Sequence, residues 1–268
     1  MGKVILITGI SSGFGKYTAE LLVRRGHIVY GTVRSDTTID PKINVLKMDL
    51  TDLISIKSVV DSILAKEGKI DIVINNAGML LSGPIELTAT EDIKLQMDTN
   101  FIGTTYVIQS VLPSMRKLGK GTIINISSIA GLVGLPFQGF YSASKFAIEG
   151  LSEALRMELK AFKIKVVVIN PGDFRTNNTI NRKYTAFNNT ENPYRGQFQK
   201  TLSIIEKTEK EGWPPEILAR KLCRIVESKN PKHRYIIGKF PDKLSVIIKP
   251  ILPSRLYSNI LGSFYGIK

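Results

Sequence analysis

A short apolar run that leads into a glycine-rich turn constrains the fold of this chain more than any other feature. The run is Lys3 to Thr8 (KVILIT), and the turn extends from Gly9 to Gly15 (GISSGFG). A β-branched run this short is too brief for a buried helix, so it predicts a buried strand. An amphipathic helix is expected from the turn to Arg25. Such a turn lets backbone amides approach a phosphate group at the positive end of a helix.

The glycine spacing of this turn excludes one common phosphate-binding loop. A Walker A loop (GxxxxGK[ST]) that ends at Gly15 and Lys16 requires glycine and then Ser or Thr where this chain has Ile10 and Tyr17. The strict GxGxxG spacing is also absent. The segment reads TGxxxGxG instead, so it suits a pyrophosphate without the Walker A arrangement.

Apolar strand patterns alternate with helical patterns as far as the segment that ends at Asn170. Further strands are expected at His27 to Val33, Ile43 to Lys47, Ile70 to Ile74, Gly121 to Ile126 and Ile164 to Asn170. Helices are expected at Asp52 to Lys66, Thr88 to Lys117 and Gly139 to Lys163. Gly103 interrupts the second of these patterns, and Pro113 is a candidate kink or end. Alternation of this kind predicts a parallel sheet. The predicted fold class is α/β, a doubly wound parallel sheet of Rossmann type flanked by helices.

Polar or glycine residues follow the predicted strands at the point where each strand ends. They are Gly9, Arg34, Asp49, Asn76, Ser128 and Pro171. The carboxyl ends of parallel strands form one edge of a sheet, and ligands bind in the crevice outside that edge. The sequence therefore predicts that these distant residues meet in one binding site.

The residue at the end of the second strand predicts which dinucleotide is bound. An acidic residue about 20 positions beyond the glycine turn binds the ribose 2′-hydroxyl of NAD, whereas arginine accommodates the 2′-phosphate of NADP. Here Arg34 follows Val33, and the first acidic residue is Asp36. NADP(H) is therefore the preferred cofactor, and NAD(H) is the alternative if the loop brings Asp36 to the ribose.

Tyr141 and Lys145 lie four positions apart in the helical pattern that begins at Gly139. Residues at this spacing share a helix face, so the phenol and the ammonium are expected about one turn apart. A nearby positive charge favours the phenolate and moves the pKa of tyrosine toward neutral pH. The pair alone also fits a solvated helix face. Its predicted place at the same sheet edge as the glycine turn favours an acid–base role.

These motifs resemble the short-chain dehydrogenase/reductase family in its single-domain form. The resemblance covers about residues 1 to 180 and includes the Asn75-Asn76-Ala77-Gly78 segment and Ser128, thirteen residues before Tyr141. Individual segments are most similar to bacterial hydroxysteroid and retinol dehydrogenase-like proteins. With Arg34, it implies cofactor contacts from Gly9, Ser11, Ser12, Gly13, Phe14, Gly15, Asp49, Leu50, Asn76, Ala77, Gly78, Tyr141, Lys145, Pro171, Gly172, Phe174 and Thr176.

The resemblance also implies how hydride transfer between a nicotinamide and a carbonyl or alcohol carbon would be assisted. Tyr141 would exchange the proton, Ser128 would hydrogen-bond the same oxygen, and Lys145 would lower the Tyr141 pKa and hold the ribose. Asn100 would anchor a water relay. Capping of a turn by Ser128 and a purely structural role for Asn100 remain alternatives.

The region from 173 to 215 loses regular periodicity and is predicted to be a lid over the nicotinamide. Its aromatic residues are Phe174, Tyr184, Phe187, Tyr194, Phe198 and Trp213. They favour a lipophilic substrate of steroid, retinoid or long-chain type, although they also suit a small core of the lid itself. The predicted oxidoreductase domain covers residues 1–240 and includes this lid.

A basic and apolar extension is expected at residues 241–268. Prolines interrupt it too often for a membrane span, but a segment of this type suits an anionic membrane surface. Packing over the substrate cleft or against another subunit are the alternatives. A homo-oligomer is implied by the resemblance alone.

Composition excludes several other classes of function. The formal net charge is +14, but the basic residues are spread along the chain, so no nucleic-acid site is expected. One Cys and two His residues supply neither a multi-Cys zinc site nor a His-based metal site, and no metal is predicted. No signal peptide or membrane-spanning run is recognised, which predicts a cytoplasmic protein with membrane association left open. An NADP(H)-dependent oxidoreductase is the leading hypothesis, and a non-catalytic dinucleotide-sensing or scaffolding protein is the alternative.

Overall fold

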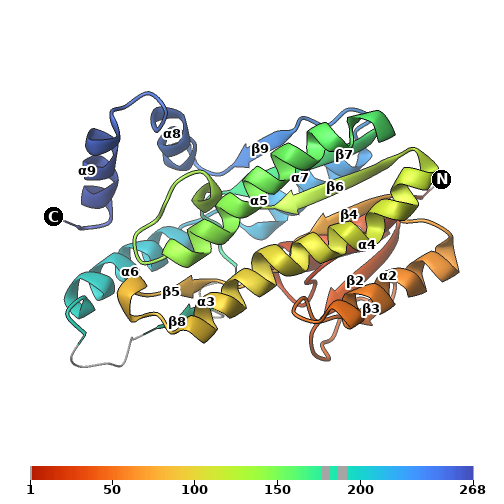
Figure 1. Ribbon diagram of the computed structural model, residues 1–268, viewed down its shortest axis with the longest axis horizontal. Coiled ribbons are helices and arrows are strands. Elements are labelled where there is room, and N and C mark those ends of the chain that lie inside the picture. Colours follow the sequence, from red (N-terminus) through yellow and green to blue (C-terminus); the bar gives the residue numbers. More distant parts are fainter. Residues whose placement is uncertain (1, 177–181, 186–191, 268) are drawn as a thin grey trace.

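A seven-stranded parallel sheet forms the centre of the protein in the computed structural model, which describes residues 2–176, 182–185 and 192–267. The strands are β1 (Val4–Ile7), β2 (Ile28–Val33), β3 (Asn44–Lys47), β4 (Ile72–Asn75), β6 (Gly121–Ile126), β7 (Ile164–Pro171) and β9 (Arg234–Ile237). They lie in the order β3, β2, β1, β4, β6, β7, β9 (Figure 1). The predicted doubly wound fold class is confirmed.

Helices cover both faces of this sheet. The helices α1 (Gly13–Arg24) and α7 (Pro215–Glu227) pack on one face, and α2 (Leu53–Glu67), α4 (Gly103–Leu118) and α5 (Gly139–Glu158) pack on the other (Figure 1). Successive residues of β1 point to opposite faces, so Ile5 and Leu6 belong to different core clusters. Because both faces are buried, the strand reads as a continuous apolar run instead of an alternating one.

The order of the strands turns at β1. This strand pairs with β2 on one side and with β4 on the other, in parallel register. The chain first builds the sheet outward to β3 and then returns to continue it through β4 and β6. A reversal of this kind leaves a crevice outside the carboxyl ends of the two central strands, where the functional residues were predicted to meet.

The helix expected from Thr88 to Lys117 is interrupted just before Gly103, the residue that breaks the helical pattern in the sequence. It consists of α3 (Thr90–Met97), a π-helical turn (Asp98–Ile102) and α4, and Pro113 lies inside α4 without ending it. The helix that carries Tyr141 ends at Glu158, and a 3-10 turn (Lys160–Phe162) follows it.

The region from 173 to 215 contains more regular structure than expected. Its largest element is α6 (Arg195–Lys210), whose buried residues Phe198, Leu202 and Ile205 recur at helical spacing. A short strand, β8 (Lys183–Tyr184), pairs with β5 (Leu81–Ser82). The expected lack of regular structure is therefore wrong for the described part of this region, and its role as a lid stays a prediction. Residues 177–181 and 186–191, and with them Phe187, lie outside the described residues.

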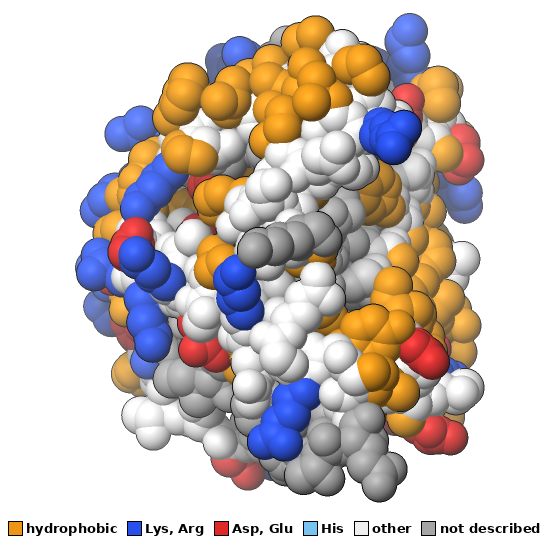
Figure 2. All heavy atoms as spheres, turned by 90° about the vertical axis from the view of Figure 1, so that its left-hand side faces the viewer, with side chains coloured by type: hydrophobic (Ala, Val, Ile, Leu, Met, Phe, Trp, Pro, Cys, Tyr) orange, Lys and Arg blue, Asp and Glu red, His pale blue; other side chains and the backbone are white. Residues whose placement is uncertain are grey.

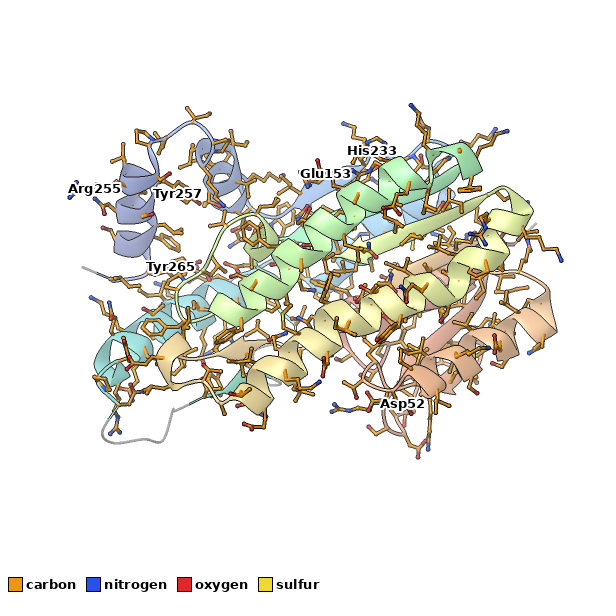
Figure 3. All side chains as sticks on the ribbon, viewed as in Figure 1. Asp52, Glu153, His233, Arg255, Tyr257 and Tyr265 are labelled. Carbon is orange, nitrogen blue, oxygen red and sulfur yellow. The ribbon has the colours of Figure 1, made fainter. Side chains whose placement is uncertain are left out.

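Two helices at the C-terminus lie over the same end of the sheet as α6, on the left in Figure 1. They are α8 (Phe240–Ile248) and α9 (Ser254–Phe264). The Tyr257 hydroxyl joins α9 to α8 by donating to Ser245 O (3.1 Å), and Tyr265 O, just after α9, accepts from Thr201 Oγ1 of α6 (2.9 Å) (Figure 3). Within the described ranges, no helix has the length and apolar character needed to cross a membrane.

Candidate active site

The glycine-rich turn between β1 and α1 depends on glycine at three positions. Gly9 and Gly13 have φ values of +71° and +56°, in the left-handed region that L side chains rarely adopt. A Cβ at Gly15 would lie 2.1 Å from the carbonyl oxygen of Gly9. Ser12 precedes the first turn of α1, and its side chain makes no capping hydrogen bond there. The amide groups at this helix end therefore provide a site suited to an anion.

Asn76 and Thr8 hold this turn against the end of β4. The Asn76 side-chain amide donates to Thr8 O (3.0 Å) and to Gly9 O (2.7 Å). In return, the Thr8 hydroxyl accepts from the backbone N–H groups of Asn76 and Ala77, each at 3.0 Å. The two side chains therefore fix the shape of the turn. This explains the threonine at the start of the TGxxxGxG motif, because its hydroxyl binds the segment after β4.

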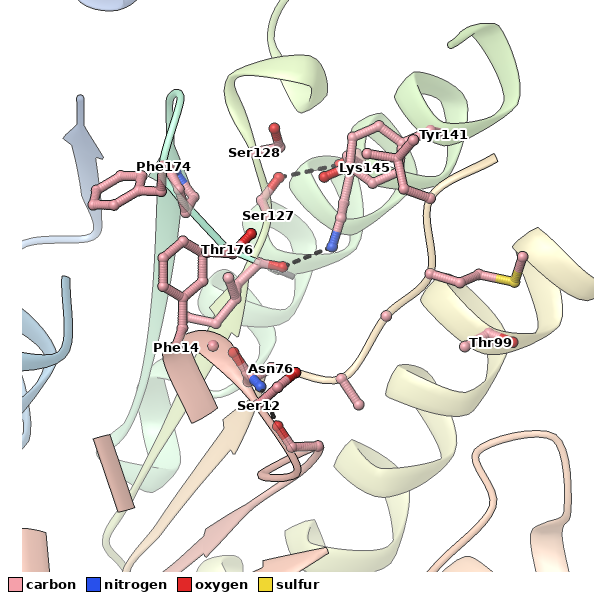
Figure 4. Close-up of a pocket in the computed structure, with 18 of the residues that line it drawn as sticks. Ser12, Phe14, Asn76, Thr99, Ser127, Ser128, Tyr141, Lys145, Phe174 and Thr176 are labelled. Atoms are coloured by element: carbon pink, nitrogen blue, oxygen red, sulfur yellow. Dashed lines mark hydrogen bonds between the residues drawn. The ribbon is translucent and has the colours of Figure 1, made fainter. Parts of the chain in front are cut away.

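One cleft of about 730 Å³ collects nearly all of the predicted site residues. It is lined by Gly9, Ser11, Ser12, Gly13, Phe14, Arg34, Asp49, Leu50, Asn76, Ala77, Gly78, Ser128, Tyr141, Lys145, Pro171, Gly172, Phe174 and Thr176, a part of which Figure 4 shows. Gly15 and Asn100 do not line it. Gly15 instead lies against Gly9 and Asn76, where the close approach excludes any side chain.

Ser128, Tyr141 and Lys145 come together at this cleft, as predicted (Figure 4). The Lys145 ammonium lies 5.8 Å from the centre of the Tyr141 ring and donates to the carbonyl oxygen of Ile126 (2.9 Å). Ser128 follows β6, and its hydroxyl accepts from the backbone N–H of Ala130 (3.1 Å). Ser128 therefore caps a turn and also faces Tyr141, so the two interpretations of this residue are compatible.

Burial determines the protonation of the Tyr141 and Lys145 pair. It raises the pKa of Tyr141 above its ordinary value, while hydrogen bonding with the Ser128 side chain acts in the opposite direction. Burial also lowers the pKa of Lys145 to about 8, an effect that the Glu149 carboxylate opposes. The groups that lower the Tyr141 pKa are Ser128 and Arg182, and not Lys145 as expected; burial outweighs them, so the phenol holds its proton at neutral pH.

Asn100 lies beside the cleft in the π-helical turn. Its side-chain oxygen accepts from Met79 N (2.8 Å), and its amide donates to Met79 O (3.0 Å) and to the Ser144 hydroxyl (3.1 Å). The Ser144 hydroxyl in turn donates to Tyr141 O (2.7 Å). This side chain therefore joins the segment after β4 to the helix turn that carries Tyr141.

Beside β2, the positive charge of Arg34 lies at the rim of the cleft, whereas the negative charge of Asp36 lies away from it. Arg34 and Ser35 line it, whereas Asp36 does not and forms an ion pair with Lys47 (2.9 Å). Asp49 accepts from the backbone and the hydroxyl of Thr51, each at 2.8 Å, and these hydrogen bonds lower the pKa of its carboxyl group. Arginine at the rim thus meets the requirement for a 2′-phosphate.

Aromatic side chains close the cleft near the glycine turn. The Phe14 and Phe174 rings meet edge to face with their centres 5.1 Å apart, and Phe174 meets Trp213 in the same way at 6.2 Å. Phe174 belongs to the buried core. Phe174 therefore lines the cleft, as predicted, and also packs in the core of the protein.

Several cleft residues were missed by sequence reasoning. Met48 and Thr51 lie after the end of β3, and Asp173 follows Gly172 after the end of β7, so the rule that marked Asp49 and Pro171 also applies to them. Ile205, Thr208 and Glu209 come from α6, and Tyr265 comes from the C-terminal segment. These four carry no local signal of a place at the cleft, because only the tertiary fold brings their segments to it.

Comparisons with known proteins agree with this geometry. A family model described as short chain dehydrogenase matches residues 3–186. The 3-ketodihydrosphingosine reductase of Bacteroides thetaiotaomicron is 46% identical over 266 residues, 99% of each protein. The NADPH-dependent 3-dehydrocapnine reductase of Ornithobacterium rhinotracheale is 30% identical over 272 residues, 96% of this chain and 95% of that protein. The crystal structure of a short-chain dehydrogenase from Streptomyces avermitilis has a TM-score of 0.83 and 28% identity, covering 98% of this chain and 97% of that one.

The family match includes the glycine turn, the Asn75-Asn76-Ala77-Gly78 segment and the residues Ser128, Tyr141 and Lys145. It spans most of the chain, and two relatives align along nearly its whole length. The resemblance inferred from these motifs is confirmed. The chain is therefore an oxidoreductase that belongs to the short-chain dehydrogenase family.

Proposed function

We propose that this protein is an NADPH-dependent reductase of a long-chain ketone, of the 3-keto sphingoid base type. The observation that carries the proposal is the meeting of Ser128, Tyr141 and Lys145 in one cleft with the glycine turn and Arg34. The names of two relatives support the substrate class, since one is a 3-ketodihydrosphingosine reductase and the other an NADPH-dependent 3-dehydrocapnine reductase.

The residues of the cleft fit a dinucleotide phosphate. Space for a pyrophosphate is left at Gly13, where an added Cβ would meet nothing closer than the Thr176 side chain at 3.8 Å. Arg34 is placed to hold the 2′-phosphate of NADPH, and Asp49 to hold the adenine. The ion pair of Asp36 with Lys47 argues against the alternative, in which Asp36 holds the ribose of NADH. NADP(H) is therefore the proposed cofactor.

Bound NADPH supplies the hydride, and the residues around it manage the carbonyl oxygen. Tyr141, whose raised pKa keeps the phenol protonated, donates the proton to that oxygen. Ser128 hydrogen-bonds the same oxygen and thereby places the carbonyl. Lys145, with a pKa of about 8, holds the ribose and provides a proton store next to Tyr141. Asn100 acts as a positioning residue through Ser144.

An apolar wall suits a lipophilic chain on the ketone. Apolar side chains from four parts of the fold line the cleft beyond the cofactor segments: Met79, Leu80, Leu95, Ile129, Leu135 and Ile205. Burial of such a chain contributes about 0.8 kcal/mol for each CH₂ group removed from water. The affinity of the ketone is therefore expected to rise with its chain length.

The function is tested by NADPH consumption with a panel of ketones. The panel contains a C18 3-keto sphingoid base, shorter homologues, a steroid ketone and a retinal. The expected result is the highest kcat/KM for the C18 amino ketone, with the secondary alcohol detected by mass spectrometry. Binding of NADPH without turnover of any ketone would contradict this function and favour a dinucleotide sensor.

We also propose that the extension 241–268, together with the start of α8, lies on an anionic membrane. Apolar side chains gather at the top of the face seen in Figure 2, over α8 and α9, and the most exposed are Phe240 (74%) and Ile251 (71%). Lys243, Lys249 and Arg255 belong to the same segment. The Lys249 ammonium donates to Leu132 O and the Lys243 ammonium lies over the Trp213 ring, whereas Arg255 is exposed. An exposed apolar surface with a cation beside it matches the chemistry of an anionic bilayer surface.

Sedimentation with anionic vesicles tests this contact. The triple substitution Phe240→Ser, Ile247→Ser and Ile251→Ser is expected to release the protein from the vesicles, because all three side chains are largely exposed. Ile54→Ser is the matched control, since Ile54 is 81% exposed on α2, at another part of the molecule. Equal binding by both variants, or no binding by the unaltered protein, would exclude the membrane surface.

A further inference from the structure

The buried face of α5, the helix that carries Tyr141 and Lys145, is largely polar. Two of its buried residues are apolar, Ile148 and Leu155, and the others are Ser142, Ser144, Lys145, Glu149 and Ser152. Glu149 is the single carboxylate among them, and it is only 7% exposed. Burial of a carboxylate is costly, and an apolar side chain of similar volume often stabilises a fold as well. A role beyond stability is therefore expected for Glu149.

Both oxygens of the Glu149 carboxylate accept hydrogen bonds from strands of the sheet. Oε1 accepts from Nδ2 of Asn170 on β7 (2.6 Å), and Oε2 accepts from Nη2 of Arg234 on β9 (2.7 Å). The same Nδ2 of Asn170 also donates to the main-chain oxygen of Ser128 (3.0 Å). Glu149 is therefore connected to Ser128 through one intervening side chain, that of Asn170.

Glu149 also acts on the charge of Lys145. It lies four positions later on the same helix, so the two side chains share a helix face about one turn apart. The Lys145 ammonium is buried and donates to the carbonyl oxygen of Ile126 (2.9 Å). Burial lowers the pKa of this ammonium, and the Glu149 carboxylate opposes the effect. Ser128 and Lys145 therefore both depend on one carboxylate.

Other titratable side chains surround these two groups. Those that line the cleft with Lys145 are Arg34, Asp49, Tyr141, Asp173, Lys183, Glu209 and Tyr265. Around Glu149, Arg234 comes from β9, and Glu153 and Arg156 come from α5 itself. Of all these charges, that of Glu149 acts against the loss of the Lys145 proton.

We infer that Glu149 is a positioning residue, which holds the main chain of Ser128 through Asn170 and supplies the negative charge that keeps Lys145 an ammonium. The inference rests on the roles proposed above for Ser128 and Lys145, and it applies to any ketone. Glu149 does not line the cleft, so it acts only through these neighbours. Without its charge, the proton store next to Tyr141 empties at a lower pH.

The test measures kcat/KM for NADPH against pH at saturating ketone, because this ratio reports the groups of the free enzyme. In the unaltered protein it is expected to fall on the alkaline side, with a midpoint near the Lys145 pKa of about 8. Glu149→Gln keeps an oxygen for the Asn170 amide but loses the charge, so the midpoint is expected about one pH unit lower. At about pH 8 the ammonium fraction, and with it kcat/KM, then falls about 5-fold.

Arg234→Gln is expected to shift the midpoint in the opposite direction. The Arg234 side chain is 43% exposed on an edge strand, so its replacement leaves the core intact. Removal of this cation leaves the Glu149 charge less neutralised, which moves the midpoint to higher pH. Glu153→Gln is the matched control, because Glu153 is exposed one turn further along α5 and does not line the cleft. Its midpoint should not move.

Asn170→Ala tests the connection to Ser128. This variant keeps the charge of Glu149 and removes the hydrogen bond to Ser128 O. We expect kcat to fall about 10-fold through misplacement of Ser128, with the alkaline midpoint and the affinity for NADPH unchanged. An unchanged kcat would overturn this part of the inference.

A measurement without substrate distinguishes this inference from the proposed function. The ¹³Cε signal of Lys145, assigned by its loss in Lys145→Arg, is titrated with pH, and the same shifts of midpoint are expected in Glu149→Gln and Arg234→Gln. Unmoved midpoints in these two variants, or an equal shift in Glu153→Gln, would overturn the inference and leave the reductase function standing. The expected NMR shifts without reduction of any ketone would instead overturn the proposed function.

Discussion

Replacing Tyr141 with Phe is expected to lower kcat for ketone reduction by about 10²- to 10⁴-fold, the usual contribution of a general acid. The phenol is held at the cleft with Ser128 and Lys145, and burial keeps it protonated at neutral pH. The substitution removes one oxygen and leaves the ring that packs beside the Lys145 ammonium. Stopped-flow measurement of hydride transfer, with NADPH affinity from fluorescence titration, would separate the chemical step from binding.

The matched control for this variant is Tyr106→Phe. Tyr106 belongs to α4, where its ring packs against the core on one face of the sheet and does not line the cleft. This control should retain kcat, whereas Tyr141→Phe should lose it at unchanged NADPH affinity. Full turnover in Tyr141→Phe would show that another group supplies the proton.

Replacing Arg34 with Ser is expected to reverse the choice of cofactor. A charged hydrogen bond to phosphate contributes about 1.5–3 kcal/mol, so kcat/KM for NADPH should fall about 10- to 100-fold. NADH lacks the 2′-phosphate, and its kcat/KM should change little. Steady-state rates with each cofactor, at one ketone concentration and one ionic strength, measure the ratio.

Lys42→Ala serves as the control for Arg34→Ser. Lys42 is exposed and lies between β2 and β3, but it does not line the cleft. The control removes the same charge from the same part of the surface, so it reports any general electrostatic effect. Similar losses with NADPH and NADH in Arg34→Ser would mean that Arg34 does not contact the 2′-phosphate.

The sheet and most of the cleft could be predicted because their causes are local. Short β-branched runs such as Val4–Ile7 have few alternatives to a buried strand, and parallel strands bring their carboxyl ends to one edge. The sequence alone therefore predicts one cleft lined by Gly9, Arg34, Ser128 and Pro171. The prediction that Tyr141 and Lys145 lie at this cleft required only their helical spacing and the position of their helix in the fold.

The remaining features depend on contacts between distant segments. In the π-helical turn, Asn100 forms hydrogen bonds with Met79 and Ser144. The periodicity of the helix does not predict these hydrogen bonds. The ion pair of Arg182 with Glu209 joins a segment beside β8 to α6. The raised pKa of Tyr141 results from burial, which exists only after the chain has folded. By contrast, the spacing of Phe198, Leu202 and Ile205 carried a helical signal for α6 that was available in the sequence.

The packing of α1 against α7 determines when this protein can fold during its synthesis. The first helix buries Ala19 and Leu22 in the same core cluster as Leu218 and Leu222, and the Arg25 side chain pairs with Glu227 at 2.7 Å. These partners leave the ribosome about 200 residues later, after most of the chain has been translated. The nascent chain must carry an uncovered apolar helix throughout this interval, a state that favours aggregation and the binding of chaperones.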